Sequence, residues 1–362
     1  MSNVVDGPIA ARSFEGDRSQ NLAGVRRWLI VLYLLVLAMV VIGGITRLSG
    51  SGLSMVDWRP LMGTVPPLND GQWAEVFTQY QASPEGRLVN AGVSLADFKA
   101  IFFWEYLHRL VGRLIGVVFA VPFFYFVARR RMNRALSART GIAFALGGAQ
   151  GLLGWYMVKS GLVDVPHVSH FRLAAHLLLA FGTAQWILWI ILGLPPERRE
   201  DAVGGPASTA FRWATVGFIA LLTLQILYGA FMAGTHAGVV SATFPDMNGS
   251  YGPGPFFTAP TLLDDFMHHA PAIHYLHRGL GWLVLFVGGA LWVAARRHGE
   301  PDASTRAALG ALVVLGVQFA LGALTVVLQV ALWVAVVHQV GAFVALSAAT
   351  VLAHRAWAPH SS

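Results

Sequence analysis

Eight apolar runs, most of about 20 residues, alternate with shorter polar segments along this chain of 362 residues. A run of that length can cross a hydrocarbon core of about 30 Å as an α-helix. The pattern therefore predicts an all-α membrane protein with eight transmembrane helices. The expected spans are 27–46, 104–128, 140–159, 170–193, 211–233, 271–295, 307–329 and 332–354.

Arginines gather in alternate connections between these spans, at 129–139, 198–199 and 296–306. Cytoplasmic connections carry such an excess, so these segments and both termini are expected in the cytoplasm of a bacterium, with the protein in its inner membrane. The long connections 47–103 and 234–270 then face the periplasm. We expect them to fold as caps, with short helices near 71–80 and 95–103. Tails are expected at 1–25, disordered through Gln20, and at 357–362, with a cytoplasmic linker at 196–210.

The composition is 56% hydrophobic and only 12% charged, with a mean hydropathy of +0.59. The net charge of +7 follows from the arginine-rich connections, so membrane lipid is the expected surroundings and no nucleic acid is expected. The absence of cysteine excludes disulfides, thiolate ligands and Cys-bound iron–sulfur clusters. Histidine is then the expected metal ligand.

The two halves of the chain resemble each other. Tyr106-Leu107-His108-Arg109 opens the second span, and Tyr275-Leu276-His277-Arg278 opens the sixth. Gln150 through Gly154 matches Gln318 through Gly322, and His176 matches His338. Four spans per copy give both copies the same orientation. We expect a parallel 4+4 repeat of residues 26–195 and 211–356, with a pseudo-two-fold axis along the membrane normal.

Four histidines lie one to two turns inside the outer ends of alternate spans: His108, His176, His277 and His338. A single histidine in a span is more often a hydrogen-bonded interhelical residue. Four at matched depth favour two bis-histidine haem sites near the periplasmic side. Structural zinc fits less well, since it prefers four ligands that usually include cysteine. His268, His269 and His274 form a weaker candidate metal cluster beside a loop.

Arg109 and Arg278 directly succeed two of these histidines. They could snorkel or form ion pairs, or they could hold haem propionates. Glu105 precedes His108 by one helical turn, where the second half has His274. Glu105 could pair with Arg109, or it could orient water or move protons beside the first haem. The difference suggests that one half reacts while the other carries electrons.

These motifs resemble the haem A synthases, above all those of mitochondria and alphaproteobacteria. The resemblance rests on residues 43–55 (GGITRLSGSGLSM), on Trp58-Arg59-Pro60 and on Glu105 through Arg109. It covers the chain from the first span to the last. The resemblance implies conversion of haem O to haem A for cytochrome oxidase, by two hydroxylations of the C8 methyl group and loss of water to leave a formyl group.

The same resemblance implies site roles. A haem b cofactor is expected at His277 and His338 with Arg278, and substrate haem O at His108 and His176 with Arg109. Glu105 is expected as the catalytic acid. Some relatives carry a cysteine pair in an outer loop, and this chain has none.

Two other functions stay open: a di-haem electron-transfer cytochrome, and a repeat-built transporter with a histidine proton relay. The sequence identifies neither the electron donor nor the oxygen source. Contact with the farnesyltransferase that produces haem O is expected, and self-association is left open.

Overall fold

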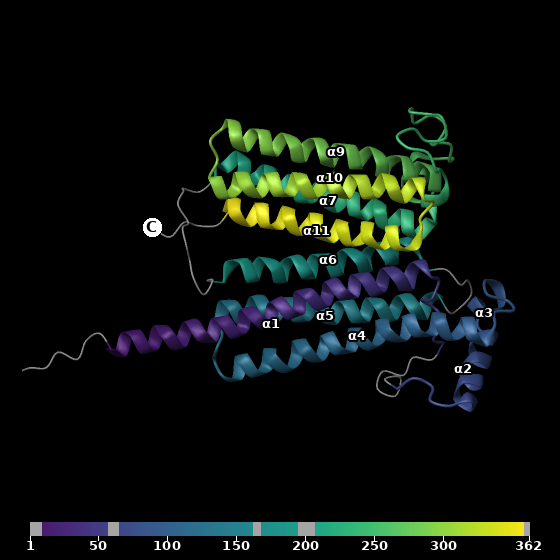
Figure 1. Ribbon diagram of the computed structural model, residues 1–362, viewed down its shortest axis with the longest axis horizontal. Coiled ribbons are helices and arrows are strands. Elements are labelled where there is room, and N and C mark those ends of the chain that lie inside the picture. The colour runs from purple at the N-terminus through teal and green to yellow at the C-terminus, as the bar shows by residue number, and fades with distance from the viewer. Residues whose placement is uncertain (1–8, 57–64, 162–167, 195–206, 358–362) are drawn as a thin grey trace, which may run out of the picture.

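The computed structural model describes residues 9–56, 65–161, 168–194 and 207–357, and shows eight long helices that lie side by side (Figure 1). All eight are long and apolar enough to cross a membrane, so the expected all-α membrane fold is confirmed. The long helices are α1 (Ile9–Leu48), α4 (Leu95–Ala128), α5 (Arg134–Gly161), α6 (His170–Gly193), α7 (Thr209–Thr235), α9 (Ala270–Arg297), α10 (Asp302–Val327) and α11 (Leu332–Trp357). The short ones are α2 (Asp70–Ala82), α3 (Pro84–Leu88), η2 (Ala237–Val239) and α8 (Leu262–Met267).

Two boundaries differ from the sequence-based expectation. Helix α1 begins at Ile9, so the segment expected to be disordered through Gln20 is helical over most of its length. Helix α4 begins at Leu95, so the short helix expected near 95–103 is the first part of the transmembrane helix itself. The Ser94 hydroxyl caps α4 by accepting a hydrogen bond from the Asp97 amide, 3.1 Å away, and no Gly or Pro interrupts residues 95–111. The helix expected near 71–80 is confirmed as α2.

The helices form two groups of four with the same order of contacts. In the first group α1 packs on α4, α4 on α5, α5 on α6 and α6 on α1. In the second, α7, α9, α10 and α11 repeat this order. The groups meet where α1 and α6 face α7 and α11 (Figure 1). These contacts agree with a 4+4 repeat, but the repeat arrangement and its pseudo-two-fold axis both stay predictions.

Aromatic and hydroxyl side chains fill the boundary between the groups. Phe181 of α6 and Phe343 of α11 are fully buried and pack edge to face, with ring centroids 5.2 Å apart. The Tyr33 hydroxyl of α1 lies 2.7 Å from the Ser347 hydroxyl of α11. This shared core fixes the two groups against each other.

Both long connections fold at the same end of the bundle, where α2 and α3 lie near the start of α4 (Figure 1). Tyr80, Phe98 and Phe102 form a buried cluster that holds α2 on the first turns of α4. The two caps therefore cover the same ends of the helices that carry the candidate histidines.

Candidate functional site

One large cavity lies between the helices and is lined by all four candidate histidines. Its volume is about 1240 Å³, above the range of about 300–1,000 Å³ found for most small-molecule sites. Glu105, Arg109 and Arg278 also line it. The structure therefore brings together every residue that the sequence suggested for the haem sites.

His277 of α9 and His338 of α11 face each other across the C-terminal half. Their ring centroids lie 6.5 Å apart and their planes are nearly perpendicular, at 87°. Two imidazoles that bind one metal ion from opposite sides have ring centres about 6 Å apart, since each metal–nitrogen bond is about 2 Å. The Nδ1 atom of each ring is buried, and no described residue hydrogen-bonds it. The pair fits axial ligation of one haem iron.

Gln225 of α7 lies beside this pair, with its Nε2 atom 3.4 Å from Nε2 of His277. A ligand on that ring nitrogen requires the amide to move. Glutamine has several rotatable bonds, so it can adapt more readily than the helix backbone.

Arg278 donates hydrogen bonds to three neighbours from its guanidinium. It donates to Nε2 of His274 at 2.9 Å and to the backbone oxygens of Thr243 and Asp246 at 2.8 and 2.7 Å. Its Nη2 atom is buried, and no described residue accepts from it. A buried guanidinium nitrogen beside a cavity is suited to a carboxylate such as a haem propionate.

In the N-terminal half, His108 of α4 and His176 of α6 line the same cavity. The Nδ1 atom of His176 is buried and lacks a hydrogen-bond partner among the described residues. This half therefore offers a second histidine pair on helices that correspond to α9 and α11.

Four glycines lie behind the four imidazoles. Three of them, Gly43, Gly154 and Gly322, belong to motifs noted in the sequence, which gave them no role. A Cβ atom at any of the four would lie closer to the ring than ordinary van der Waals contact allows. The distances from that Cβ position are 3.3 Å for Gly43 to Nε2 of His108, 3.1 Å for Gly154 to Cε1 of His176, 3.1 Å for Gly229 to Cε1 of His277, and 2.9 Å for Gly322 to Cε1 of His338. Each glycine comes from the helix that precedes its histidine helix, so glycine makes room for the ring.

A glutamine one turn before two of these glycines holds the backbone of the facing histidine. Gln150 donates to the backbone oxygen of His176 at 3.0 Å. Gln318 makes the same bond to His338 at 2.9 Å. The Gln-x-x-x-Gly pattern shared by α5 and α10 was the sequence signal for this support.

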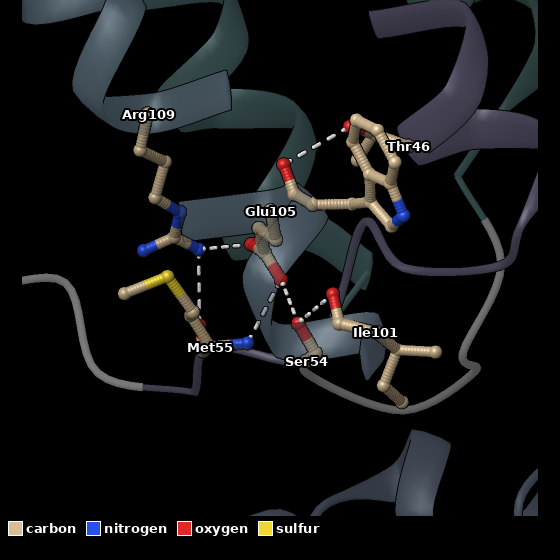
Figure 2. Close-up of polar contacts among 7 residues, drawn as sticks. Thr46, Ser54, Met55, Ile101, Glu105 and Arg109 are labelled. Carbon is tan, nitrogen blue, oxygen red and sulfur yellow. Dashed lines mark hydrogen bonds and ion pairs between the residues drawn. The ribbon is translucent and has the colours of Figure 1, made fainter. Parts of the chain in front are cut away.

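Figure 2 shows the surroundings of Glu105, which is 2% exposed. Its Oε2 atom accepts from the Ser54 hydroxyl at 2.7 Å and from the Met55 amide at 2.8 Å. Its Oε1 atom accepts from Arg109, which also donates to the backbone oxygen of Met55 at 3.0 Å. The ion pair considered from the sequence is thus present. It also ties the loop after α1 to the start of α4.

The sequence pattern of the COX15-CtaA family, described as cytochrome oxidase assembly protein, matches residues 26–350. The chain belongs to this family. Among its relatives are proteins named haem A synthase from three bacteria. That of Nitrosospira multiformis is 41% identical, covering 90% of this chain and 92% of the relative. Those of Paramagnetospirillum magneticum and Novosphingobium aromaticivorans are 40% identical, covering 93% and 96% of this chain and 95% and 98% of the relatives.

The hypothesis that His268, His269 and His274 together bind a metal ion is wrong for the residues that the structure describes. The three imidazoles have separate partners. Nε2 of His274 accepts a hydrogen bond from Arg278, and Nδ1 of His269 lies 3.1 Å from Oδ1 of Asp265. The centroid of the His268 ring lies 5.6 Å from that of His170. The described part of the chain holds no group of three or more residues that could bind a metal ion in this way.

Some residues on which the sequence-based predictions depend lie outside the part of the chain that the structure describes. These are Trp58-Arg59-Pro60, which contributed to the family resemblance, and Arg198-Arg199, which contributed to the orientation.

Proposed function

We propose that this chain is a haem A synthase, an oxidoreductase that converts haem O to haem A. The C8 methyl group is hydroxylated to a hydroxymethyl group and again to a geminal diol, which loses water to give the formyl group. Each hydroxylation adds one oxygen atom and is a two-electron oxidation, so the proposal requires an oxidant from outside the chain for each step. Family membership supports the class of enzyme. The structural observation that carries the proposal is one cavity with two histidine pairs whose neighbours differ, Glu105 in one half and His274 in the other.

The C-terminal half is the proposed site of the haem b cofactor. His277 and His338 would hold its iron, and the Arg278 Nη2 would bind a propionate. Haem b supplies one-electron transfer when bound. Gly229 and Gly322 leave the space that the two imidazoles need, and Gln318 fixes the backbone of the second ligand.

The N-terminal half is the proposed site of substrate haem O, with His108 and His176 as ligands to the substrate iron. Arg109 lines this part of the cavity from a position held by Glu105 and Met55. Glu105 is the candidate catalytic residue, because it is the carboxylate that lines the cavity in this half. A carboxylate there can orient water or accept a proton from it.

The membrane orientation belongs to the same proposal. Arginine-rich connections place both termini in the cytoplasm and both haem sites near the periplasmic side of the inner membrane. Haem O is scarcely soluble in water, so the proposed supply is within the membrane, in contact with the farnesyltransferase that makes it.

Mass spectrometry of haems extracted from purified protein tests this function. Cells that also produce haem O should yield protein with haem b and haem A, the latter marked by the formyl group in its reduced pyridine spectrum. Bound haem without any haem A would favour the electron-transfer cytochrome. Protein without haem would favour the transporter.

Ligand assignments are tested by His277→Ala and His338→Ala, each of which should remove most of the low-spin haem b absorbance. His354→Ala is the matched control, since His354 is on α11 but packs against Trp189, with ring centroids 4.9 Å apart, rather than lining the cavity. A full low-spin spectrum in both ligand variants would contradict the assignment.

A further inference from the structure

The two halves differ at one seam, between α4 and α5 in the first half and between α9 and α10 in the second. Although both seams flank the same cavity, α4 and α5 pack far less closely than α9 and α10. Closely packed helices exclude a ligand, whereas a loose seam leaves a path between them.

Residue size contributes to this difference at four positions that line the cavity in the first half. Farther from the histidines the first seam is closed, because Phe119 and Phe123 of α4 pack on Phe144 of α5 with ring centroids 5.4 and 5.5 Å apart. Counting from the shared Tyr-Leu-His-Arg and Gln-x-x-x-Gly motifs, four seam positions are small or charged in the first half and large and apolar in the second. They are Arg113 against Trp282, Gly116 against Leu285, Gly147 against Leu315, and Gly151 against Phe319.

In the second half these large side chains close the seam. Trp282 of α9 and Phe319 of α10 pack together with ring centroids 4.4 Å apart. Phe244, from the loop before α9, covers both rings at 6.4 and 5.8 Å. Leu315 is only 5% exposed. These aromatic contacts join α9 and α10 beside the cavity.

In the first half five of the glycines that line the cavity on α4 and α5 are exposed. They are the glycines at 112, 116, 147, 148 and 151. For four of them, 116, 147, 148 and 151, an added Cβ would meet nothing within 4 Å. Leu152 also lines the cavity, yet it is 70% exposed on the outer surface of α5. Together with the loose packing of α4 on α5, these exposed residues indicate that the cavity opens toward the bilayer between the two helices.

We propose that this gap is the opening through which haem O enters the N-terminal site from the bilayer and through which the product haem leaves. The proposal rests on the proposed function. Haem O carries a long isoprenoid chain on a flat apolar ring, so it partitions into lipid. The start of the loop after α1 is held to α4, because the Ser54 hydroxyl and the Met55 amide donate to Glu105.

The test uses the absence of cysteine, which makes any introduced thiol unique. Gly151→Cys is purified with its C-terminal haem and treated with a bulky maleimide either before or after loading with haem O. Ala149→Cys is the matched control, because Ala149 is exposed on the same helix but does not line the cavity. Uptake and release of haem O are monitored by its absorbance change.

Modification of Gly151→Cys before loading should slow uptake about tenfold or more, and modification after loading should slow release by a similar factor. The labelled control should match the unlabelled protein. If the attached maleimide only disturbed the haem O binding pocket, it would speed release instead. Gly151→Phe, which introduces the residue of the second half, should slow both steps without a label, and its unchanged C-terminal haem spectrum would report folding.

Unchanged uptake and release in both Gly151 variants would overturn the opening and favour entry from the periplasmic face. A slowed rate that depends on protein concentration would also overturn it, by showing that the glycines contact a second copy of the chain. The proposed function fails separately, if haem O enters and leaves as expected but no haem A forms. Failure of unmodified protein to take up haem O would overturn both.

Discussion

Glu105→Gln replaces one carboxylate oxygen with an amide that donates, at a position surrounded by donors. If the amide nitrogen takes the place of Oε2, it faces the Met55 amide, which in the unsubstituted protein donates to Oε2 at 2.8 Å. If it takes the place of Oε1, it faces the Arg109 guanidinium. Neither orientation keeps all three hydrogen bonds, so the loop after α1 loses part of its attachment.

The structure sets the size of this effect. The side chains of Arg109 and Glu105 are 8% and 3% exposed. Removing one partner from a buried pair of this kind costs about 3–5 kcal/mol when the other charge is left behind. Arg109 keeps its hydrogen bond to the Met55 oxygen, so we expect the loss of stability to be about 3 kcal/mol. The loss should be confined to the periplasmic part of the first half. The second half shares none of these contacts, and its haem spectrum should not change.

Ser54→Ala is the matched comparison, because it removes one donor to Oε2 and keeps the charge. Its cost should be about 1 kcal/mol. If the carboxylate acts in the chemistry, Glu105→Gln should accumulate haem O or a hydroxylated intermediate, while Ser54→Ala should retain most haem A production. Haem composition by mass spectrometry and thermal unfolding separate the two effects.

Two results would refute this reasoning. Near-normal haem A from Glu105→Gln would show that its charge is dispensable. Equal losses in the two single variants, with no further loss in the double variant, would show that Glu105 acts only by holding the loop.

Three further predictions concern other parts of the chain. Gly322→Ala places a Cβ 2.9 Å from the imidazole behind it and should lower haem b content, whereas Gly316→Ala, whose Cβ meets nothing within 4 Å, should not; difference spectra compare them. Burial raises the pKa of the Glu85 carboxyl above 4.5, so the outer cap should lose stability as the pH rises from 4.5 through the folded-state pKa. Glu85→Gln should remove this dependence of cap stability on pH, measured by amide hydrogen exchange. Reporter fusions after Arg131 should report cytoplasm and those at Ser250 periplasm, and the reverse pattern would refute the orientation.

The sequence predicted the eight spans because the bilayer sets the length of an apolar run, and α6 has the expected bounds, 170–193. It missed the starts of α1 and α4 for the same reason. Hydropathy detects where a chain leaves lipid, whereas a helix continues until its hydrogen bonding is interrupted. Ile9 and Leu95 both lie in stretches without an apolar signal of membrane length.

The candidate site was predictable where the repeat duplicated it. His108 and His277 share a motif, and the Gln-x-x-x-Gly pattern was visible in both halves. The role of Gly154 and Gly322 could not be predicted, since it depends on the direction of an imidazole ring from the next helix. The partners of Glu105 were also hidden. Met55 lies 50 residues away along the chain, and no local pattern indicates that its amide meets the carboxylate.

With the proposed cofactor in the C-terminal half and the proposed substrate in the N-terminal half, the two halves face opposite kinetic demands, because a cofactor must stay and a substrate must exchange. Both halves have the same pair of proposed histidine ligands, which cannot account for different rates of haem exchange. The difference must therefore come from the residues that form the cavity walls. Each tenfold change in residence time needs only about 1.4 kcal/mol, and one aromatic pair contributes about 0.5–1.5 kcal/mol beyond its buried area. The Trp282–Phe319 contact with its Phe244 cover, against glycine at 151 in the other half, is therefore of the right size to convert one exchangeable haem site into a permanent one. If His277 and His338 ligate a haem as proposed, opening the second seam with Phe319→Gly should let that haem exchange with added haem while its low-spin absorbance is retained.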